Sequence, residues 1–200
     1  MKEYVEKYIN ELHTDNHRYL SWEHCYKAFG NSENSIDYLA LHLAFYLASW
    51  GMYRGSTTLL KKDYKVHYEV VKLIKPVALN RESIKSLTEI QGLMHKIFQE
   101  YDKVSVKASK TLQTKILLGT LGCFPALDRF FIDGWNLTFE SNPTDENIFS
   151  FVQENISEIE NCQKIIGRNM IYPPMKIVDM YFWQKGYDAY REKKMGKPTQ

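Results

Sequence analysis

The sequence has few cysteines, and they are not paired. Cys25, Cys123 and Cys162 lie far apart along the 200-residue chain, and no CxxC pair occurs. Zinc and iron–sulfur sites need closely spaced thiolates, so neither is predicted and we expect no metal and no cofactor. Isolated thiols without a disulfide framework are typical of the reducing cytoplasm, where we expect the protein to work.

Several catalytic and nucleotide-binding motifs are also missing. The sequence contains no GxxxxGK[ST], GxGxxG, HExxH or GxSxG, which argues against P-loop, dinucleotide-binding, zinc-protease and serine-hydrolase sites. The six histidines are dispersed and form no ligand pattern.

Long hydrophobic runs are absent as well. The most apolar stretch, YLALHLAFYLASWGMY, is too short and too interrupted to span a bilayer. The N-terminal MKEYVEKYINELH is amphipathic and lacks the apolar segment of a signal peptide. We therefore expect a soluble protein with no membrane partner, and a monomer.

The apolar residues that are present follow a helical period. Hydrophobic residues make up 44% of the chain, enough for a sizeable core, and strand-like alternation is nearly missing, so the sequence predicts an all-α fold. The net charge of +2 neither indicates nor excludes a nucleic-acid partner. Helices are expected at about 2–13, 16–29, 36–51, 81–101, 109–122, from Pro125 onward, 144–167 and 174–192, with one or two short helices ending before Pro76.

One apolar stretch carries two charges that need an explanation. The segment TLQTKILLGTLGCFPALDRFF reads as a core helix, yet it contains Lys115 and Asp128. Pro125 suits the first turn of a helix, which would put Asp128 one turn inside it, where the helix dipole stabilises a carboxylate. The helix before it starts at Ser109 and Lys110, and such a start suits a phosphate.

These residues resemble the helix-hairpin-helix superfamily of DNA glycosylases. The adenine-removing branch reads much like STAGAILSLSLGKHFPILD, and this chain reads KTLQTKILLGTLGCFPALD without a gap. The residues shared are Thr111, Leu118, Phe124, Pro125, Leu127 and Asp128. The family places its hairpin lysine about 18 residues before the catalytic aspartate, the spacing from Lys110 to Asp128. The family hairpin LPGVGxKT aligns with VSVKASKT, where Val106 and Ala108 replace its glycines.

The resemblance implies a compact multi-helix domain over residues 1–200 with two lobes that meet at a cleft. Residues 30–131 would carry the glycosylase-like core, and residues 1–29 and 132–200 would complete the second lobe. The chain would bind double-stranded DNA, flip out a damaged or modified base and cleave its N-glycosidic bond. Asp128 would stabilise the sugar cation or activate water. Lys110, at the family's position, or Lys115, inside an apolar helix, would supply an amine if the enzyme is also a lyase.

A turn rich in aromatic residues offers the base pocket that this chemistry requires. The segment FYLASWGMYRGSTTLLKK ends the expected helix 36–51, and Tyr46, Trp50 and Tyr53 are its candidate pocket residues. The candidate DNA contacts are Arg54, Ser56, Lys61, Lys62, Ser105, Lys107 and Ser109. The acid Asp179 also interrupts an apolar stripe, and we interpret it as a buried polar residue of the core.

Two other functions fit the same residues. A helical nucleic-acid-binding protein without enzymatic activity would use the same basic positions, and an all-α protein-interaction domain would use the aromatic turn as its partner surface. The sequence fixes neither the target base nor the choice between host DNA repair and attack on modified foreign DNA.

Overall fold

The computed structural model describes residues 1–55, 57–84 and 86–195. These residues form ten α-helices and three short 3-10 helices and contain no β-strand, which confirms the all-α class. The α-helices are α1 (Lys2–Leu12), α2 (Leu20–Phe29), α3 (Ile36–Ser49), α4 (Tyr68–Ala78), α5 (Leu87–Lys103), α6 (Lys110–Thr120), α7 (Arg129–Phe139), α8 (Asp145–Glu154), α9 (Ile156–Ile165) and α10 (Pro174–Met195). The 3-10 helices are η1 (Thr58–Lys61), η2 (Tyr64–His67) and η3 (Arg81–Ser83).

The chain divides into two compact units. Unit 1 combines Met1–Thr14 with the chain from Leu127 onward, and unit 2 is the continuous stretch Asp15–Ala126. The lobes expected from the sequence had boundaries near residues 30 and 131. The observed boundaries add α2 to the unit that contains α3 and α6, and they assign Asp128 to unit 1.

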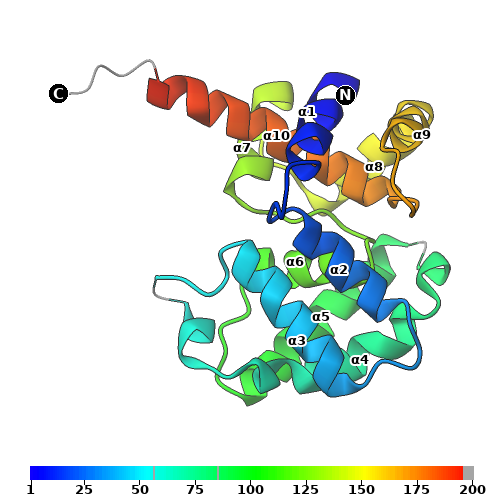
Figure 1. Cartoon of the computed structure of the whole chain (residues 1–200). Helices are drawn as coiled ribbons and strands as arrows, with labels where there is room; N and C mark the ends of the chain where they lie inside the picture. The colour runs from blue at the N-terminus through cyan, green and yellow to red at the C-terminus, as the bar shows by residue number, and fades with distance from the viewer. Residues whose placement is uncertain (56, 85, 196–200) are drawn as a thin grey trace. The chain divides into compact units, whose positions relative to one another are not determined.

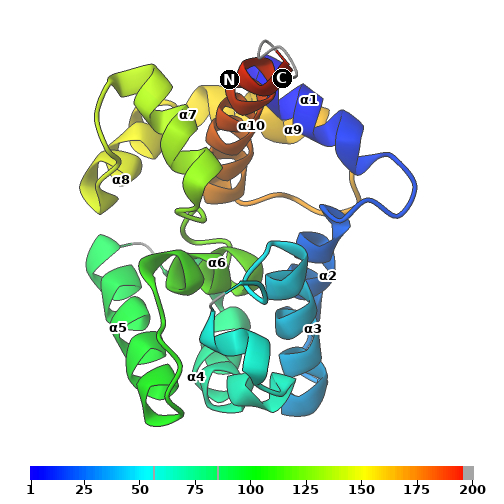
Figure 2. The same ribbon diagram turned by 90° about the vertical axis from the view of Figure 1, so that its left-hand side faces the viewer.

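Unit 2 is built around α3 and α6. Helix α6 contacts α2, α3 and α5, and Figure 2 shows α5 beside α6 and α2 beside α3. Every residue of α6 from Thr114 to Thr120 is buried, which agrees with its apolar sequence. The Trp22 indole on α2 donates a hydrogen bond of 2.9 Å to the Leu118 carbonyl oxygen and so fixes α2 against α6.

Unit 1 is built around α10. Helices α1, α7, α8 and α9 all contact it, and Figure 2 shows α7 and α1 on opposite sides of it, whereas in Figure 1 they overlap it. Helices α7 and α10 cross with their backbones in contact. A Cβ on Gly134 would lie 1.9 Å from the Phe182 carbonyl oxygen, and a Cβ on Gly186 would lie 2.0 Å from that of Phe130. Only glycine fits at either position.

Several expected helix boundaries were wrong. Pro76 lies inside α4 instead of after it, two residues before the helix ends, so it removes only one of the last hydrogen bonds. The helix expected over 144–167 is two helices, because Asn155 leaves the helical conformation and separates α8 from α9. The helix expected over 81–101 starts only at Leu87, where Ser86 and Glu89 form a capping box.

The helix expected to start at Pro125 begins four residues later. Residues Cys123–Leu127 are not helical, and α7 starts at Arg129. Asp128 is therefore the N-cap of α7 instead of a residue one turn inside it, with φ −94° and ψ 177°. This correction bears directly on the candidate site.

Candidate functional site

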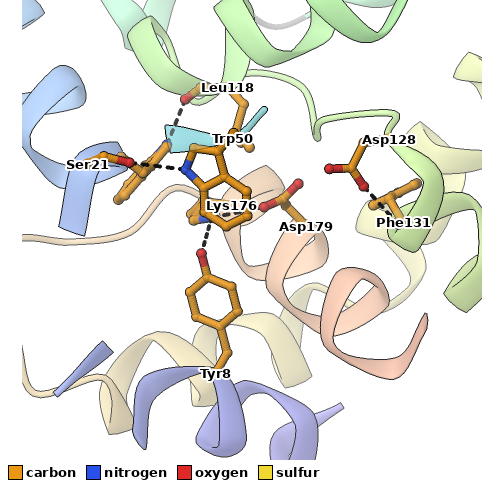
Figure 3. Close-up of polar contacts among 9 residues, drawn as sticks. Tyr8, Ser21, Trp50, Leu118, Asp128, Phe131, Lys176 and Asp179 are labelled. Carbon is orange, nitrogen blue, oxygen red and sulfur yellow. Dashed lines mark hydrogen bonds and ion pairs between the residues drawn. The ribbon is translucent and has the colours of Figure 1, made fainter. Parts of the chain in front are cut away.

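Asp128 holds the start of α7 with one of its two carboxylate oxygens. Its Oδ1 accepts hydrogen bonds from the backbone N–H groups of Phe130 at 3.1 Å and Phe131 at 3.2 Å. The side chain is partly exposed, and Figure 3 shows its contact with Phe131. The backbone therefore fixes the orientation of this carboxylate within unit 1, and the helix dipole stabilises its negative charge.

A six-residue connector joins α5 to α6 where the sequence predicted the hairpin. Val104 and Ser105 form a turn, and Ser105 takes the left-handed conformation at φ 56°. Val106 and Ala108 are 3% and 4% exposed. The residues that replace the hairpin glycines thus point into the core, and the positive φ falls on Ser105 instead. Ser109 caps α6 by accepting a hydrogen bond from the Leu112 N–H at 3.2 Å.

Contacts bring the connector together with the lysines that follow the aromatic turn. The Lys62 ammonium donates to the Val104 carbonyl oxygen at 3.1 Å. The Lys107 N–H donates to the Thr58 hydroxyl at 3.3 Å. The side chains of five predicted DNA contacts are exposed in this part of unit 2: Lys61, Lys62, Ser105, Lys107 and Ser109. They form one surface with two basic segments, which we call the connector surface.

Arg54 and Ser56, the other two predicted DNA contacts, precede this surface in the chain. Arg54 is exposed, and its guanidinium lies over Gly51, where an added Cβ would be 3.1 Å from the Arg54 Nε. Ser56 lies outside the described residues.

The two candidate lysines differ in exposure. Lys110 is exposed at the first position of α6. Lys115 is 3% exposed, and its ammonium nitrogen donates to the Trp50 carbonyl oxygen at 3.0 Å. Trp50 follows the last residue of α3, where carbonyl groups lack partners within the helix. Lys115 therefore joins the middle of α6 to the end of α3.

The Trp50 indole is packed between polar and aromatic side chains of unit 2. Tyr19 stacks on it with ring centroids 5.3 Å apart and planes 16° apart. The Arg18 guanidinium lies 4.9 Å from the centroid of the Trp50 ring. The Trp50 Nε1 donates to the Ser21 hydroxyl at 3.2 Å, as Figure 3 shows. The ring remains partly exposed. Because Tyr19 covers one face, a flipped base would have only part of this ring as a stacking surface.

The other two predicted pocket residues face the interior to different degrees. Tyr46 is 2% exposed, and a Cβ on Gly119 would lie 2.4 Å from its ring. Its ring thus fills the contact between α3 and α6 and belongs to the core. Tyr53 is half-buried, and its hydroxyl lies 2.6 Å from the Nε2 of His67.

His67 forms a buried polar chain that sequence reasoning missed. Its Nε2 contacts the Tyr53 hydroxyl and its Nδ1 contacts the Tyr101 hydroxyl, both at 2.6 Å. The ring is fully buried, and burial lowers the pKa of His67 to about 4. Burial also raises the pKa of Tyr53 to about 12, with a smaller effect from the nearby Asp63. The neutral chain ties the aromatic turn to α5, and no pattern in KVHY signals it.

We expect the buried hydrogen bonds of His67 to make folding sensitive to mild acid. His67 has a pKa near 4 in the folded state, below its ordinary value of 6.5. Its contribution to stability is therefore fully present above pH 6.5 and is lost as the pH falls towards 4. The loss should reach about 3 kcal/mol. Urea unfolding of the wild-type chain and of His67→Gln at neutral pH and at about pH 4 measures it. The variant should lose less stability on acidification. Equal losses in both proteins would contradict the expectation, and His95→Gln, at an exposed position of α5, is the control.

Unit 1 contains a buried ion pair near the start of α10. Lys176 and Asp179 are 1% and 4% exposed, and the ammonium lies 2.9 Å from an Asp179 carboxylate oxygen. The same ammonium donates to the Tyr8 hydroxyl of α1 at 3.2 Å, as Figure 3 shows. Asp179 is thus the buried polar residue that its sequence context predicted, and the pair connects α10 to α1.

Within the units, the structure brings some predicted site residues together. Lys115 contacts Trp50, and the connector surface collects five of the DNA contacts. Asp128 belongs to unit 1, whereas the other predicted site residues described belong to unit 2. In the described part of the chain, no group of three or more His, Cys, Asp or Glu side chains is placed to hold a metal ion. No helix described here is long and apolar enough to cross a bilayer.

Comparison of the chain with protein-family models, curated proteins and solved structures found no match.

Proposed function

We propose that the chain is a DNA glycosylase that excises a damaged or modified base from double-stranded DNA. The observation that carries the proposal is the position of Asp128. Its carboxylate is held by backbone N–H groups at the start of a helix, and Asp128 is the last residue of the FPALD segment on which the family resemblance rests.

The connector between α5 and α6 supports the same proposal. Two helices joined by six residues stand where the family has its hairpin, at the same sequence distance before Asp128. Because Val106 and Ala108 are buried, the exposed polar side chains of this connector are Ser105, Lys107 and Ser109. DNA contact here would rely on lysine charges and hydroxyl groups where the family uses glycine amides.

The chemistry asks for a carboxylate close to the sugar. When the bond between C1′ and the base breaks, the base leaves with the bonding electrons and positive charge develops on the deoxyribose. Asp128 would stabilise this charge and accept a proton from the water that adds to C1′. The leaving base takes up a proton in exchange for the one that water gives to Asp128, so the products are the free base and an abasic site, and the step needs no oxidant.

The direct test is base release from duplex DNA. Duplexes with a range of alkylated, deaminated, oxidised and enzymatically modified bases are incubated with the protein and then treated with alkali, which cleaves abasic sites. We expect strand cleavage on at least one modified duplex and none on the unmodified control. No cleavage on any duplex, together with no DNA binding at low salt, would overturn the proposal.

Borohydride trapping on abasic DNA tests whether a lysine acts as a nucleophile. We expect any covalent adduct to form on Lys110, because Lys115 is buried and donates to the Trp50 carbonyl oxygen. The adduct should then disappear in Lys110→Met and persist in Lys115→Met. The reverse pattern would assign the amine to Lys115, and no adduct in the wild-type chain would leave Asp128 and water as the reacting groups.

An exposed apolar stripe on α3 favours a second function, that of a protein-interaction domain. Tyr38, Leu41 and Phe45 are 46%, 46% and 58% exposed, at spacings that put them on one helix face. Large exposed apolar side chains in a row are typical of a partner surface. Under this function the chain would release no base, and Phe45→Ser would abolish partner binding without changing DNA affinity.

A further inference from the structure

A groove lies between α7 and α10 in unit 1, apart from every residue that the proposed function has used. Its volume is about 360 Å³. The residues of its lining that matter here are Arg129, Asp133, Asn136, Gly186, Tyr190 and Lys193. Gly186 lines the groove, and its close contact with α7 brings the two helices together there.

Two cations and an aromatic ring lie at the end of the groove where α7 begins. The Arg129 guanidinium carbon is 5.0 Å from the centroid of the Tyr190 ring, which holds the arginine against α10. Lys193 is one turn beyond Tyr190 on the same helix. Arginine held over an aromatic ring, with a lysine beside it, suits a phosphate group.

One carboxylate in the groove balances part of this charge. The Arg129 Nε lies 3.4 Å from an Asp133 carboxylate oxygen, with the two side chains 68% and 43% exposed. This pair uses one side of the guanidinium, and the two terminal nitrogens carry four further N–H groups. The groove therefore presents a positive end and, at Asp133, an acceptor for a hydroxyl or an amine.

The wall of the groove contains a second acceptor. The Asn136 amide nitrogen donates to Asn142 at 3.3 Å, while its Oδ1 is buried and makes no hydrogen bond in the described part of the chain. A buried acceptor without a donor is unfavourable, and a rotation of the Asn136 side chain toward the groove would let a ligand hydroxyl or amine satisfy it. With the Tyr190 ring, the lining combines phosphate-binding groups, acceptors and an aromatic face.

We infer that this groove binds a nucleotide unit, with the phosphate at Arg129 and Lys193 and the sugar or base at Asp133, Asn136 and Tyr190. The unit is a residue of a DNA strand or a free nucleotide, since both present the same groups. The inference rests on the proposed function for the choice of DNA. Arg129 directly follows Asp128, and a carboxylate that reaches a deoxyribose necessarily lies near the phosphates on either side of that sugar.

Charge removal at the groove tests the inference. Fluorescein-labelled duplex DNA is titrated with the wild-type chain, with R129A/K193A and with the control K2A/K164A, over a range of salt. Lys2 and Lys164 are on α1 and α9, outside the groove lining, and their removal changes the net charge equally. The groove variant should bind DNA about tenfold more weakly at low salt. The slope of log affinity against log salt concentration should be less steep by about 1.8, because two phosphate contacts are lost. The control should keep most of the DNA affinity and most of the salt dependence.

Three further results decide between the sources and between the proposals. Calorimetric binding of thymidine monophosphate that is lost in R129A/K193A would assign the groove to a free nucleotide, whereas binding of DNA alone would assign it to a strand. An equal loss of DNA affinity in R129A/K193A and K2A/K164A would overturn the inference that the groove binds a nucleotide unit. So would the absence of binding of either probe by the wild-type chain. If the groove variant loses DNA affinity but the wild-type chain releases no base, the glycosylase proposal is wrong and the inference of nucleotide binding in the groove is supported. If the wild-type chain releases a base and the groove and control variants bind DNA equally well, only the inference of nucleotide binding in the groove is wrong.

Discussion

Asp128→Asn should reduce base release by about a hundredfold to a thousandfold while leaving the fold unchanged. Asparagine caps a helix as well as aspartate does, so the hydrogen bonds to Phe130 and Phe131 can persist. The substitution removes only the negative charge that the proposed mechanism places beside the sugar. The rate of abasic-site formation, measured on the duplex that the wild-type chain cleaves, is the readout.

A second variant separates the charge from the cap. Asp128→Ala removes both, so it should lose the same activity and about 1 kcal/mol of unfolding free energy in addition. Asp128→Asn should lose only the roughly 0.3–1 kcal/mol that the helix dipole contributes to the charged form. Full activity of Asp128→Asn would remove the carboxylate from the mechanism, whatever its effect on stability.

Gly134→Ala should destabilise the protein by at least about 3 kcal/mol. The added Cβ would lie 1.9 Å from the Phe182 carbonyl oxygen. A backbone oxygen cannot rotate away as a side chain would, so α7 and α10 must separate. Urea unfolding followed by circular dichroism measures the change, and a variant that does not accumulate as folded protein meets the expectation as well.

Gly92→Ala provides the matched control for this substitution. Gly92 lies inside α5, and nothing stands within 4 Å of its added Cβ. Alanine should therefore stabilise the protein by about 0.5–1 kcal/mol through helix propensity alone. Loss of stability in Gly92→Ala similar to that in Gly134→Ala would show that the helix crossing is not the cause.

The sequence predicted the helices well where one apolar period continued, and poorly where a local bond decided the boundary. Helix α6 and its burial followed from its apolar residues. The start of α7 did not, because Pro125 satisfies the rule for a first helical position and only the bonds to Asp128 move the start to Arg129. Pro76 was misplaced for a related reason, since a proline near the end of a helix disturbs only a few bonds.

The candidate site shows the same limit. The sequence identified Lys115 as an unusual charge in an apolar helix, but not its acceptor, because the Trp50 carbonyl is 65 residues away along the chain. Tyr46 and Trp50 look alike in sequence, four residues apart, yet one fills the core and the other stacks partly exposed on Tyr19. His67 gave no signal, since its partners Tyr53 and Tyr101 come from separate segments.

The division of unit 1 between the two ends of the chain has a consequence for synthesis on the ribosome. Helix α1 is made before unit 2, whereas its partners α9 and α10 are made after unit 2. Unit 2 is continuous and can fold as soon as it has emerged, since domains generally fold as units during translation. Throughout that time the apolar face of α1, with Val5, Tyr8, Ile9 and Leu12, has no partner. The amphipathic helix α1 must therefore wait, with its apolar face uncovered, until more than 150 residues that follow it have been made.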